Sequence, residues 1–569
     1  MLSRRDFLAV AAATAAVTGL GDRLAAAAAR QLLSQQDLLT FSPKGQVTIL
    51  HMTDCHAQLV PAYYREPSVN LGVGDAAGKP PHVTGSDFLK LFDIAPGSAR
   101  AYALTSEDFA ALAKDYGRVG GMDRMATLVE AIRAERGADR TLFLDGGDSL
   151  QGSYTALQSK GADMVKVLNR LGVEATTGHW EFTYGADRVL EFAGDKESRG
   201  ELEAAFLAGN VFDTEWDEPV FNSSKMFEKG GVKIAVIGQA FPFTPIANPR
   251  WMIPAWSFGI RERVVRERVA AVRKAGAELV VLLSHNGFDV DRKLASRVEG
   301  IDVILTGHTH DALPVPVKVN GTLLIATGSS TKFLSRLDVE VKNGRLTDYE
   351  YALIPVLADA ITPDPDMAKL VAEIRAPHKA KLETVLGRTE TLLYRRGNFN
   401  GTFDDLICNA MLEERDAEIA LSPGFRWGPS LLPGQDITWD DVYSETGMTY
   451  PACYRLDMTG EMLKAILEDV ADNLFNHDPY YQQGGDMVRV GGMGYAIAVN
   501  AAMGQRISDM TLLKNGEPIE PERVYKVAGW ASVNQNTEGP PIWDVVGAYL
   551  KRKGTVRVAP NSAIKVAAT

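Results

Sequence analysis

Cysteine is scarce in this sequence: the 569 residues contain only Cys55, Cys408 and Cys453. Three thiols cannot build a dense disulfide framework, and they do not supply the four thiolates of a typical structural zinc site. The spacing leaves open whether Cys408 and Cys453 pair. A hydrophobic core must therefore stabilise the fold, and a hydrophobic content of 46% over this length is enough for one or more large domains.

Positive charge is also in deficit. The formal net charge is −12 and the isoelectric point is near 5.4. Such a chain lacks the overall basic character of nucleic-acid-binding proteins, so we exclude a nucleic-acid partner. An anionic substrate would have to be held by specific side chains or by metal ions.

Long apolar runs are missing as well. The Ala-rich run that ends at Leu20 is too short to span a bilayer. It follows Arg4 and Arg5 and precedes the small residues 25–29, which is the order of a twin-arginine export signal. We therefore predict a signal segment over residues 1–30 and a periplasmic mature protein without a membrane span. A basic helix retained in the cytoplasm is the alternative.

Short β-branched runs alternate with helical patterns from Val47 to about Pro355, which predicts an α/β fold. Helices are expected over Met122–Arg136 and Ile260–Ala275. The expected strands are Val47–Thr53, Thr141–Leu144, Val232–Gly238, Leu279–Ser284, Val303–Thr306 and Thr322–Ala326.

The domain organisation follows from changes in this pattern. Between residues 60 and 116 it weakens into Pro, Gly, Tyr and Ser, which suggests an insertion near the mouth of a site. Residues 361–386 are typical of a helical connector. We predict a catalytic domain over residues 31–360 and a mixed α/β substrate-recognition domain over residues 387–569.

Five motifs follow predicted strands, where open α/β sheets place ligand-binding residues. They contain five of the nine histidines. One such residue alone is more often a capping or buried polar group, but five motifs in one domain favour a metal site. The motifs are Thr53-Asp54-Cys55-His56, Asp145-Gly146-Gly147-Asp148, Gly178-His179-Trp180-Glu181, Ser284-His285-Asn286-Gly287 and Gly307-His308-Thr309-His310.

The residue types predict a pair of divalent cations. Two adjacent cations repel, so a carboxylate must bridge them while imidazoles and a second carboxylate complete the ligand sets. Asp148 lies in a glycine turn that allows close backbone approach, and it is the expected bridge. The mixed oxygen and nitrogen ligands suit manganese, iron or zinc.

The five motifs resemble those of the calcineurin-like metallophosphoesterases, and the two-domain layout resembles periplasmic 5′-nucleotidases. The resemblance covers most of the predicted mature chain. It implies a layered β-sandwich flanked by helices, followed by a C-terminal α/β substrate domain. It also implies one metal ion bound by Asp54, His56, Asp148 and His310, and a second bound by Asp148, His179, His285 and His308.

One motif departs from the nucleotidases. They carry Gly-Asn-His-Glu-Phe-Asp where this chain has Gly178-His179-Trp180-Glu181-Phe182-Thr183. His179 replaces the metal-binding Asn and can still coordinate. Trp180 replaces the catalytic His, and Thr183 replaces its Asp partner, so a phosphomonoesterase would lose its acid dyad.

The run from Gly178 to Gly185, Asp54-Cys55-His56 and the segment Gly491–Tyr495 resemble the SoxB thiosulfohydrolases of the sulfur-oxidation (Sox) pathway. This resemblance implies two Mn²⁺ ions and release of sulfate from a cysteine S-thiosulfonate on a SoxYZ-like carrier protein with a flexible cysteine arm. It also accounts for Trp180, because a persulfide is a weakly basic leaving group that needs little protonation.

Further site residues are expected on the same grounds. Arg426 follows Phe425 in the loop that replaces Asn-Gly-Gly-Gly-Ile-Arg of the nucleotidases, so we expect it to pair with the sulfonate and to act with Asp148 and His179 in catalysis. The alternative for Arg426 is a surface or interdomain salt bridge. The expected substrate-binding residues are Arg426, Phe425, Tyr495 and Trp180, and those expected to orient ligands are Glu181 and Asn286.

Core packing explains any single aromatic residue of that set equally well. Cys55 lies between two predicted ligands, and a small buried residue is a better interpretation of it than a redox group. Two alternative functions remain open. One is a 5′-nucleotidase or cyclic phosphodiesterase, and the other is a non-catalytic, metal-stabilised binding protein.

Overall fold

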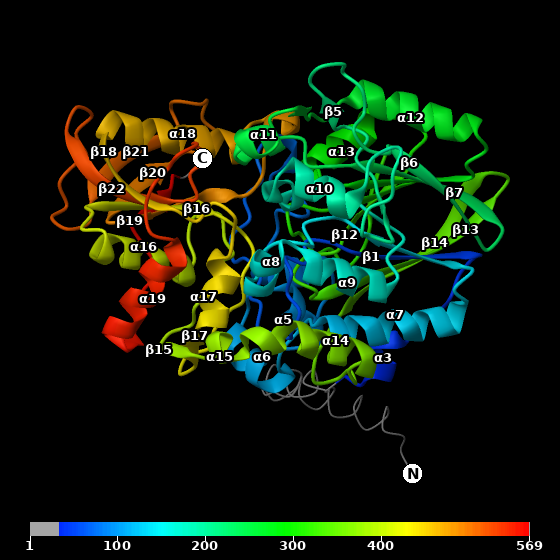
Figure 1. The fold of residues 1–569 in the computed structure, drawn as a ribbon, viewed down its shortest axis with the longest axis horizontal. Helices are drawn as coiled ribbons and strands as arrows, with labels where there is room; N and C mark the ends of the chain where they lie inside the picture. Colours follow the sequence, from blue (N-terminus) through cyan, green and yellow to red (C-terminus); the bar gives the residue numbers. More distant parts are fainter. Residues whose placement is uncertain (1–32, 568–569) are drawn as a thin grey trace, which may run out of the picture.

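The computed structural model describes residues 33–567, and its first half is built on two six-stranded sheets (Figure 1). The first sheet has the order β14 (Arg345–Pro355), β13 (Phe333–Lys342), β1 (Val47–Met52), β2 (Thr141–Asp145), β3 (Ala175–Thr176) and β4 (Ala205–Phe206). The second has the order β11 (Val317–Val319), β12 (Thr322–Ala326), β10 (Val303–Thr306), β9 (Leu279–Ser284), β7 (Val232–Gln239) and β6 (Ser224–Lys229).

Four consecutive strands of each sheet are parallel. In the first sheet β1 to β4 run in one direction, and in the second β12, β10, β9 and β7 do so. Their inner faces meet in a core that includes Ile49, Leu144, Val281 and Leu283, each fully buried. Both faces of the second sheet are covered, so all six residues of β9 are buried. This burial explains why the strand is a nearly continuous apolar run.

Helices cover the two outer faces. The first sheet carries α7 (Met122–Arg136) and α9 (Ala162–Leu171), and the second carries α12 (Glu262–Lys274) and α13 (Phe288–Arg297) (Figure 1). On α12 the buried residues Val265, Val269 and Val272 recur at helical spacing and form its apolar stripe. The predicted layered β-sandwich flanked by helices is confirmed.

The second half has its own sheets. Its main sheet has the order β18 (Cys453–Thr459), β22 (Val524–Trp530), β16 (Ile419–Gly424) and β19 (Asp486–Gly491). Two small sheets contain β15 (Val385–Thr389), β17 (Asp436–Thr438) and β23 (Thr555–Val556), and β20 (Met493–Ile497), β21 (Ile507–Leu512) and β24 (Ile564–Val566). The helices are α16 (Thr402–Glu414), α17 (Trp439–Thr446), α18 (Gly460–Phe475) and α19 (Ile542–Lys553). The predicted α/β character is confirmed.

Shorter elements join these parts. The segment expected as a connector holds α14 (Pro365–Arg375), which packs on α7 and α9, and α15 (Lys379–Leu382). The segment 60–116 contains a 3₁₀ helix (Gly74–Ala76) and three short α-helices, α4 (Gly85–Leu91), α5 (Ala99–Leu104) and α6 (Phe109–Tyr116). The remaining ones are α3 (Gln35–Leu39), α8 (Tyr154–Ser159), α10 (Ala186–Ala193), α11 (Thr244–Ala247), β5 (Phe212–Asp213) and β8 (Trp256–Ser257).

Three sequence expectations concern the termini and the thiols. The predicted signal, residues 1–30, lies outside the described residues. Within residues 33–567, no helix combines the length and apolar character needed to cross a membrane. Cys55, Cys408 and Cys453 are all buried and unpaired, so Cys408 and Cys453 form no disulfide.

Leu283→Ala tests the core between the sheets. Removing this fully buried side chain should lower the free energy of unfolding by about 2–5 kcal/mol, because lost apolar burial adds to the cost of a cavity. Urea unfolding of the metal-free protein measures this. Leu456→Ala, at a side chain that is 52% exposed, is the control and should stay within about 0.5 kcal/mol of wild type. Equal effects of the two substitutions would contradict the assigned core.

Candidate metal centre and substrate pocket

All seven predicted metal ligands lie at one edge of the two sheets, where the parallel strands end. The ligands, in chain order, are Asp54 and His56 after β1, Asp148 after β2, His179 after β3, His285 after β9, and His308 and His310 after β10. The carboxyl ends of parallel strands meet at one edge, so residues more than 250 positions apart come together here.

The side chains form two clusters whose ligand atoms lie within 4.8 Å of one another. One cluster is Asp148, His179, His285 and His308, and the other is Asp54, His56 and His310. Within the described residues these are the groups with metal-ligand geometry. Their membership matches the two predicted ligand sets, except that Asp148, the expected bridge, falls in one cluster.

Asp148 lies between the clusters. Its Oδ2 is 3.0 Å from His179 Nδ1 and 3.0 Å from His285 Nε2, and it is 3.9 Å from His56 Nε2 in the other cluster. Its Oδ1 accepts a hydrogen bond of 2.7 Å from the Trp180 backbone N–H. The carboxylate is therefore fixed by one oxygen and offers the other to both groups of imidazoles.

The second cluster is equally tight. Asp54 Oδ1 lies 3.3 Å from His310 Nε2 and 3.6 Å from His285 Nε2. His56 Nε2 and His310 Nε2 face each other at 3.0 Å. Two imidazole nitrogens that converge in a buried space beside a carboxylate have the arrangement of ligands around a cation.

Five of the seven ligand residues have left-handed backbone conformations. Such conformations are uncommon outside glycine and cost roughly 1–3 kcal/mol each, so the surrounding fold must impose them. The φ angles are 51° at Asp54, 46° at His56, 57° at Asp148, 74° at His308 and 57° at His310.

Burial sets the protonation of the imidazoles. It lowers the pKa of His56 to about 4 and also lowers those of His179, His308 and His310. For His285 burial opposes the charge, but attraction from Asp148 and Asp54 outweighs it and raises the pKa to about 10. Four of the five imidazoles are thus neutral, which is the form that binds metal ions.

These residues fit a pair of divalent cations. The seven groups are nearly inaccessible to solvent, apart from His308, and two buried aspartates stand among them. Burying carboxylates is costly unless positive charge compensates them, and His285 alone would leave one uncompensated. Two divalent cations bound between the clusters would supply that charge.

A pocket of about 310 Å³ opens onto the centre. Among the ligands it is lined by His56, Asp148, His179, His308 and His310. Aromatic rings form one wall. Trp427 stacks on His56 with ring centroids 5.1 Å apart, Phe425 stacks on Trp427 at 4.3 Å, and Trp180 meets both edge-on.

The predicted substrate residues divide into two groups. Trp180, Phe425 and Arg426 line this pocket. Tyr495 does not line it, and instead lies on β20 in the core beneath α18, 1% exposed. Core packing, the alternative stated for it, describes its position.

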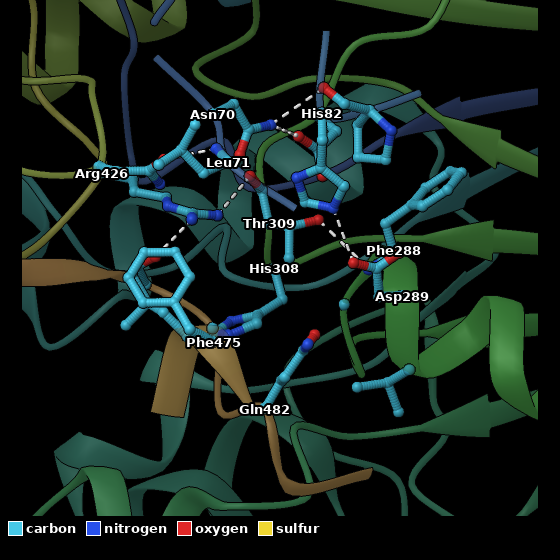
Figure 2. Close-up of a pocket in the computed structure, with 18 of the residues that line it drawn as sticks. Asn70, Leu71, His82, Phe288, Asp289, His308, Thr309, Arg426, Phe475 and Gln482 are labelled. Atoms are coloured by element: carbon cyan, nitrogen blue, oxygen red, sulfur yellow. Dashed lines mark hydrogen bonds and ion pairs between the residues drawn. The ribbon is translucent and has the colours of Figure 1, made fainter. Parts of the chain in front are cut away.

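Arg426 is already engaged. It donates to the backbone oxygens of Thr309, at 2.7 Å, and Gly485, and its Nη2 lies 3.3 Å from Asp486 Oδ1. Figure 2 shows its guanidinium beside Thr309. The guanidinium lines the pocket wall, but some of its N–H groups already bind backbone oxygens, including that of Thr309.

Glu181 and Asn286 differ from each other. Glu181 accepts from the backbone N–H groups of Ser149, at 2.8 Å, and His179, at 2.7 Å, so it fixes the two loops that carry ligands. Asn286 donates to Asp291 on α13 at 2.9 Å. Glu181 therefore fixes the backbone of two ligand-bearing loops, whereas Asn286 ties its own loop to α13.

Phe241 and Gln483 also contact the candidate ligand histidines, and neither was predicted from the sequence. The ring of Phe241, just beyond the end of β7, lies 4.1 Å from that of His179 and 4.2 Å from that of His308. His308 Nε2 bonds the Gln483 backbone oxygen at 2.7 Å. Phe241 follows a strand end like the ligands, a signal that could have found it, whereas Gln483 has no such signal.

A second, smaller cavity of about 50 Å³ adjoins the other side of His308 (Figure 2). The two cavities share His308, Arg426, Gly484 and Gly485. A Cβ on Gly484 would lie 2.6 Å from His308 Nε2, and its φ is +75°, so only glycine fits there.

Comparisons with known proteins agree with this geometry. Residues 385–543 match the family model described as "5′-nucleotidase, C-terminal domain". The solved structure of sulfate thiohydrolase SoxB from Thermus thermophilus, in complex with glycerol, is 35% identical, with a TM-score of 0.89, and the match covers 93% of this chain and 98% of that one. The chain belongs to the SoxB family of the 5′-nucleotidase superfamily.

More distant members of the superfamily match along much of the chain. Protein UshA of Yersinia enterocolitica is 25% identical over 495 residues, which are 77% of this chain and 85% of that protein. A 5′-nucleotidase precursor from Thermus thermophilus is 21% identical, with a TM-score of 0.71 over 92% of this chain and 100% of that one, and shows the shared fold. This SoxB-family chain is therefore a hydrolase of the metallophosphoesterase type.

Asp148→Asn tests the two-metal geometry. Losing the charge between the clusters should reduce binding from two Mn²⁺ ions to at most one and weaken it at least about tenfold. Calorimetric titration of the metal-depleted protein measures both. The control is Asp163→Asn on α9, a buried carboxyl that accepts from Ser159 and should leave binding unchanged. Undiminished binding of two ions by a folded Asp148→Asn protein would refute the assignment.

Proposed function

We propose that this protein hydrolyses a cysteine S-thiosulfonate on a carrier protein and releases sulfate. The match to SoxB over almost the whole chain is the observation that carries the proposal. In balanced form, one water and Cys–S–S–SO₃⁻ give Cys–S–SH, sulfate and one proton. The carrier would be a SoxYZ-like protein in thiosulfate oxidation, and its presence would agree with the predicted twin-arginine export to the periplasm.

The wall around Trp180 supports this substrate class. Trp180 is 6% exposed among Phe425, Trp427 and Tyr450. The Thr183 hydroxyl donates to the Trp180 backbone oxygen at 2.7 Å, so it serves the local turn. An acid that protonates an alkoxide is missing from these two positions, whereas a persulfide leaves as a weakly basic anion.

The seven ligand residues would hold the cations, for which we propose Mn²⁺, with Zn²⁺ or Fe as alternatives. Bound there, two divalent ions supply Lewis acidity and lower the pKa of a water molecule. The chain's own part is to keep Asp148 ionised, to orient His179 through Glu181, and to exclude bulk water with the aromatic wall.

The pocket size and charge support a peptide arm as substrate. A volume of about 310 Å³ accommodates a few residues and excludes a folded domain. The positive guanidinium of Arg426 on the pocket wall attracts a sulfonate, even with its fork partly engaged. A carrier must then present the sulfonate on an extended segment.

A nucleotidase or cyclic phosphodiesterase is the second candidate, because three relatives at 24% identity are 5′-nucleotidases. The positions of Trp180 and Thr183 weigh against it. A non-catalytic binding protein is the third, and the complete ligand set weighs against it.

A direct assay separates these functions. The Mn²⁺-loaded protein should release sulfate from a synthetic carrier peptide bearing a cysteine S-thiosulfonate, and should hydrolyse AMP and a cyclic nucleotide at least about a hundredfold more slowly. Two lost proton-transfer groups of the phosphatase type account for that difference, since each such group contributes about 10²–10⁴-fold. Ion chromatography measures sulfate and a colorimetric assay measures phosphate. Hydrolysis of nucleotides alone would overturn the proposal.

The double substitution Trp180→His with Thr183→Asp tests the specificity argument. It restores the acid dyad of the nucleotidases and should raise AMP hydrolysis at least about tenfold, because a general acid contributes about 10²–10⁴-fold when well placed. The control is Trp180→Phe, which removes the indole without adding an acid and should leave AMP hydrolysis at the wild-type level. Equal AMP hydrolysis by the folded double variant and the control would contradict the argument.

A further inference from the structure

A chain of buried ion pairs runs through the second half of the protein toward the metal-binding loop. It begins at Glu445, whose Oε2 lies 3.2 Å from Arg395 Nε, and the same Nε lies 3.1 Å from Asp404 Oδ1. Arg489 Nε lies 3.2 Å from the other Asp404 oxygen, and Arg489 Nη2 lies 3.1 Å from Asp486. Asp486 in turn lies 3.3 Å from Arg426, so positive and negative groups alternate along the chain.

The burial of these groups makes the arrangement unusual. The side chains of Arg395 and Asp404 are 0% exposed, Arg489 is 1% and Asp486 is 4% exposed. Buried ion pairs contribute little net stability compared with apolar residues of similar size, and their best-supported function is to specify one geometry. A specific arrangement is therefore a better explanation of the chain than stability.

The series of ion pairs ends at Thr309, which lies between a residue of one candidate ligand group and a residue of the other. Arg426 donates to the Thr309 backbone oxygen at 2.7 Å. His308, on one side of Thr309, belongs to one cluster, and His310, on the other side, belongs to the second. Figure 2 shows the Arg426 guanidinium next to Thr309, with the His308 ring below. Fixing this one carbonyl fixes both imidazoles relative to each other.

A second arginine from the same half acts on the next carbonyl. Arg396, adjacent to Arg395, donates to the His310 backbone oxygen at 3.1 Å and to Glu66 at 2.6 Å. His308 Nε2 also bonds the Gln483 oxygen. The loop is thus held by residues of the second half at three consecutive positions, 308, 309 and 310, in addition to the strand β10 that precedes it.

We propose that Asp404 and Arg489 are positioning residues: through Asp486 and Arg426 they hold the loop 307–310 and thereby set the spacing between the two metal ions. Asp404 contacts neither a candidate metal ligand nor the pocket. It acts through the series of ion pairs. The inference rests on the metal centre of the proposed function. In this proposal Arg426 holds the loop 307–310 whether or not substrate is bound.

Asp404→Asn in the full-length protein tests this. It keeps the size of the side chain and removes the charge that orders two arginines, so affinity for the more weakly bound Mn²⁺ should fall about tenfold, as for partners of metal ligands. The low-temperature electron paramagnetic resonance spectrum of the Mn²⁺-loaded protein should lose or alter its exchange-coupled signal. Calorimetry and this spectrum are read without substrate.

The neighbouring residue provides the matched control. Asp405 is on the same helix, α16, is 8% exposed, and accepts from the Asn561 backbone N–H at 3.2 Å. It lies near Asp404 and Arg489 but forms no ion pair with Arg395 or Arg489. Asp405→Asn should leave both Mn²⁺ affinities within about twofold of wild type. Equal affinities and spectra for Asp404→Asn and Asp405→Asn would overturn the proposal.

A second variant covers failure to fold. If circular dichroism shows that Asp404→Asn is unfolded, Asp486→Asn breaks the series of ion pairs one step before Arg426, at the end nearest the loop 307–310, and should produce the same loss of Mn²⁺ affinity. Wild-type affinity in that variant would also overturn the proposal. Failure of the wild-type protein to release sulfate would instead reject the proposed function and leave the metal measurements to decide this inference.

Discussion

Two carboxylates and five imidazoles share a space that water hardly reaches, and the rest of the molecule depends on this constraint. Burying Asp54 and Asp148 without compensation is expensive, and neutral imidazoles alone do not compensate them. Five of the seven candidate ligand residues have left-handed backbone, which the surrounding fold must impose. The two sheets provide the rigid edge on which this is done.

The second half of the chain completes the centre that the first half begins. Residues beyond 385 close the pocket with the rings of Phe425 and Trp427, and they hold the loop of His308 and His310 through backbone carbonyls. Metal spacing and pocket shape are therefore linked by the same contacts.

Much of the first half was predictable from sequence. Strands such as Leu279–Ser284 are buried on both faces and are therefore almost continuous apolar runs. Such a run is easy to delimit in the sequence, and the predicted bounds of this strand agree with the structure. The ligands followed from chemistry placed at strand ends. The sequence could not show that Tyr495 packs in a core or that Arg426 binds Thr309 O, because both depend on tertiary contacts between distant segments. The helices α4 to α6 were missed because each is short and weakly patterned.

Anomalous diffraction from crystals of the Mn²⁺-loaded protein, recorded at the manganese edge, tests the central claim most directly. Two peaks should lie a few ångströms apart, one among Asp54, His56 and His310 and the other among His179, His285 and His308, with Asp148 between them. A single peak, or peaks outside these clusters, would contradict the assignment of this edge as a two-metal centre.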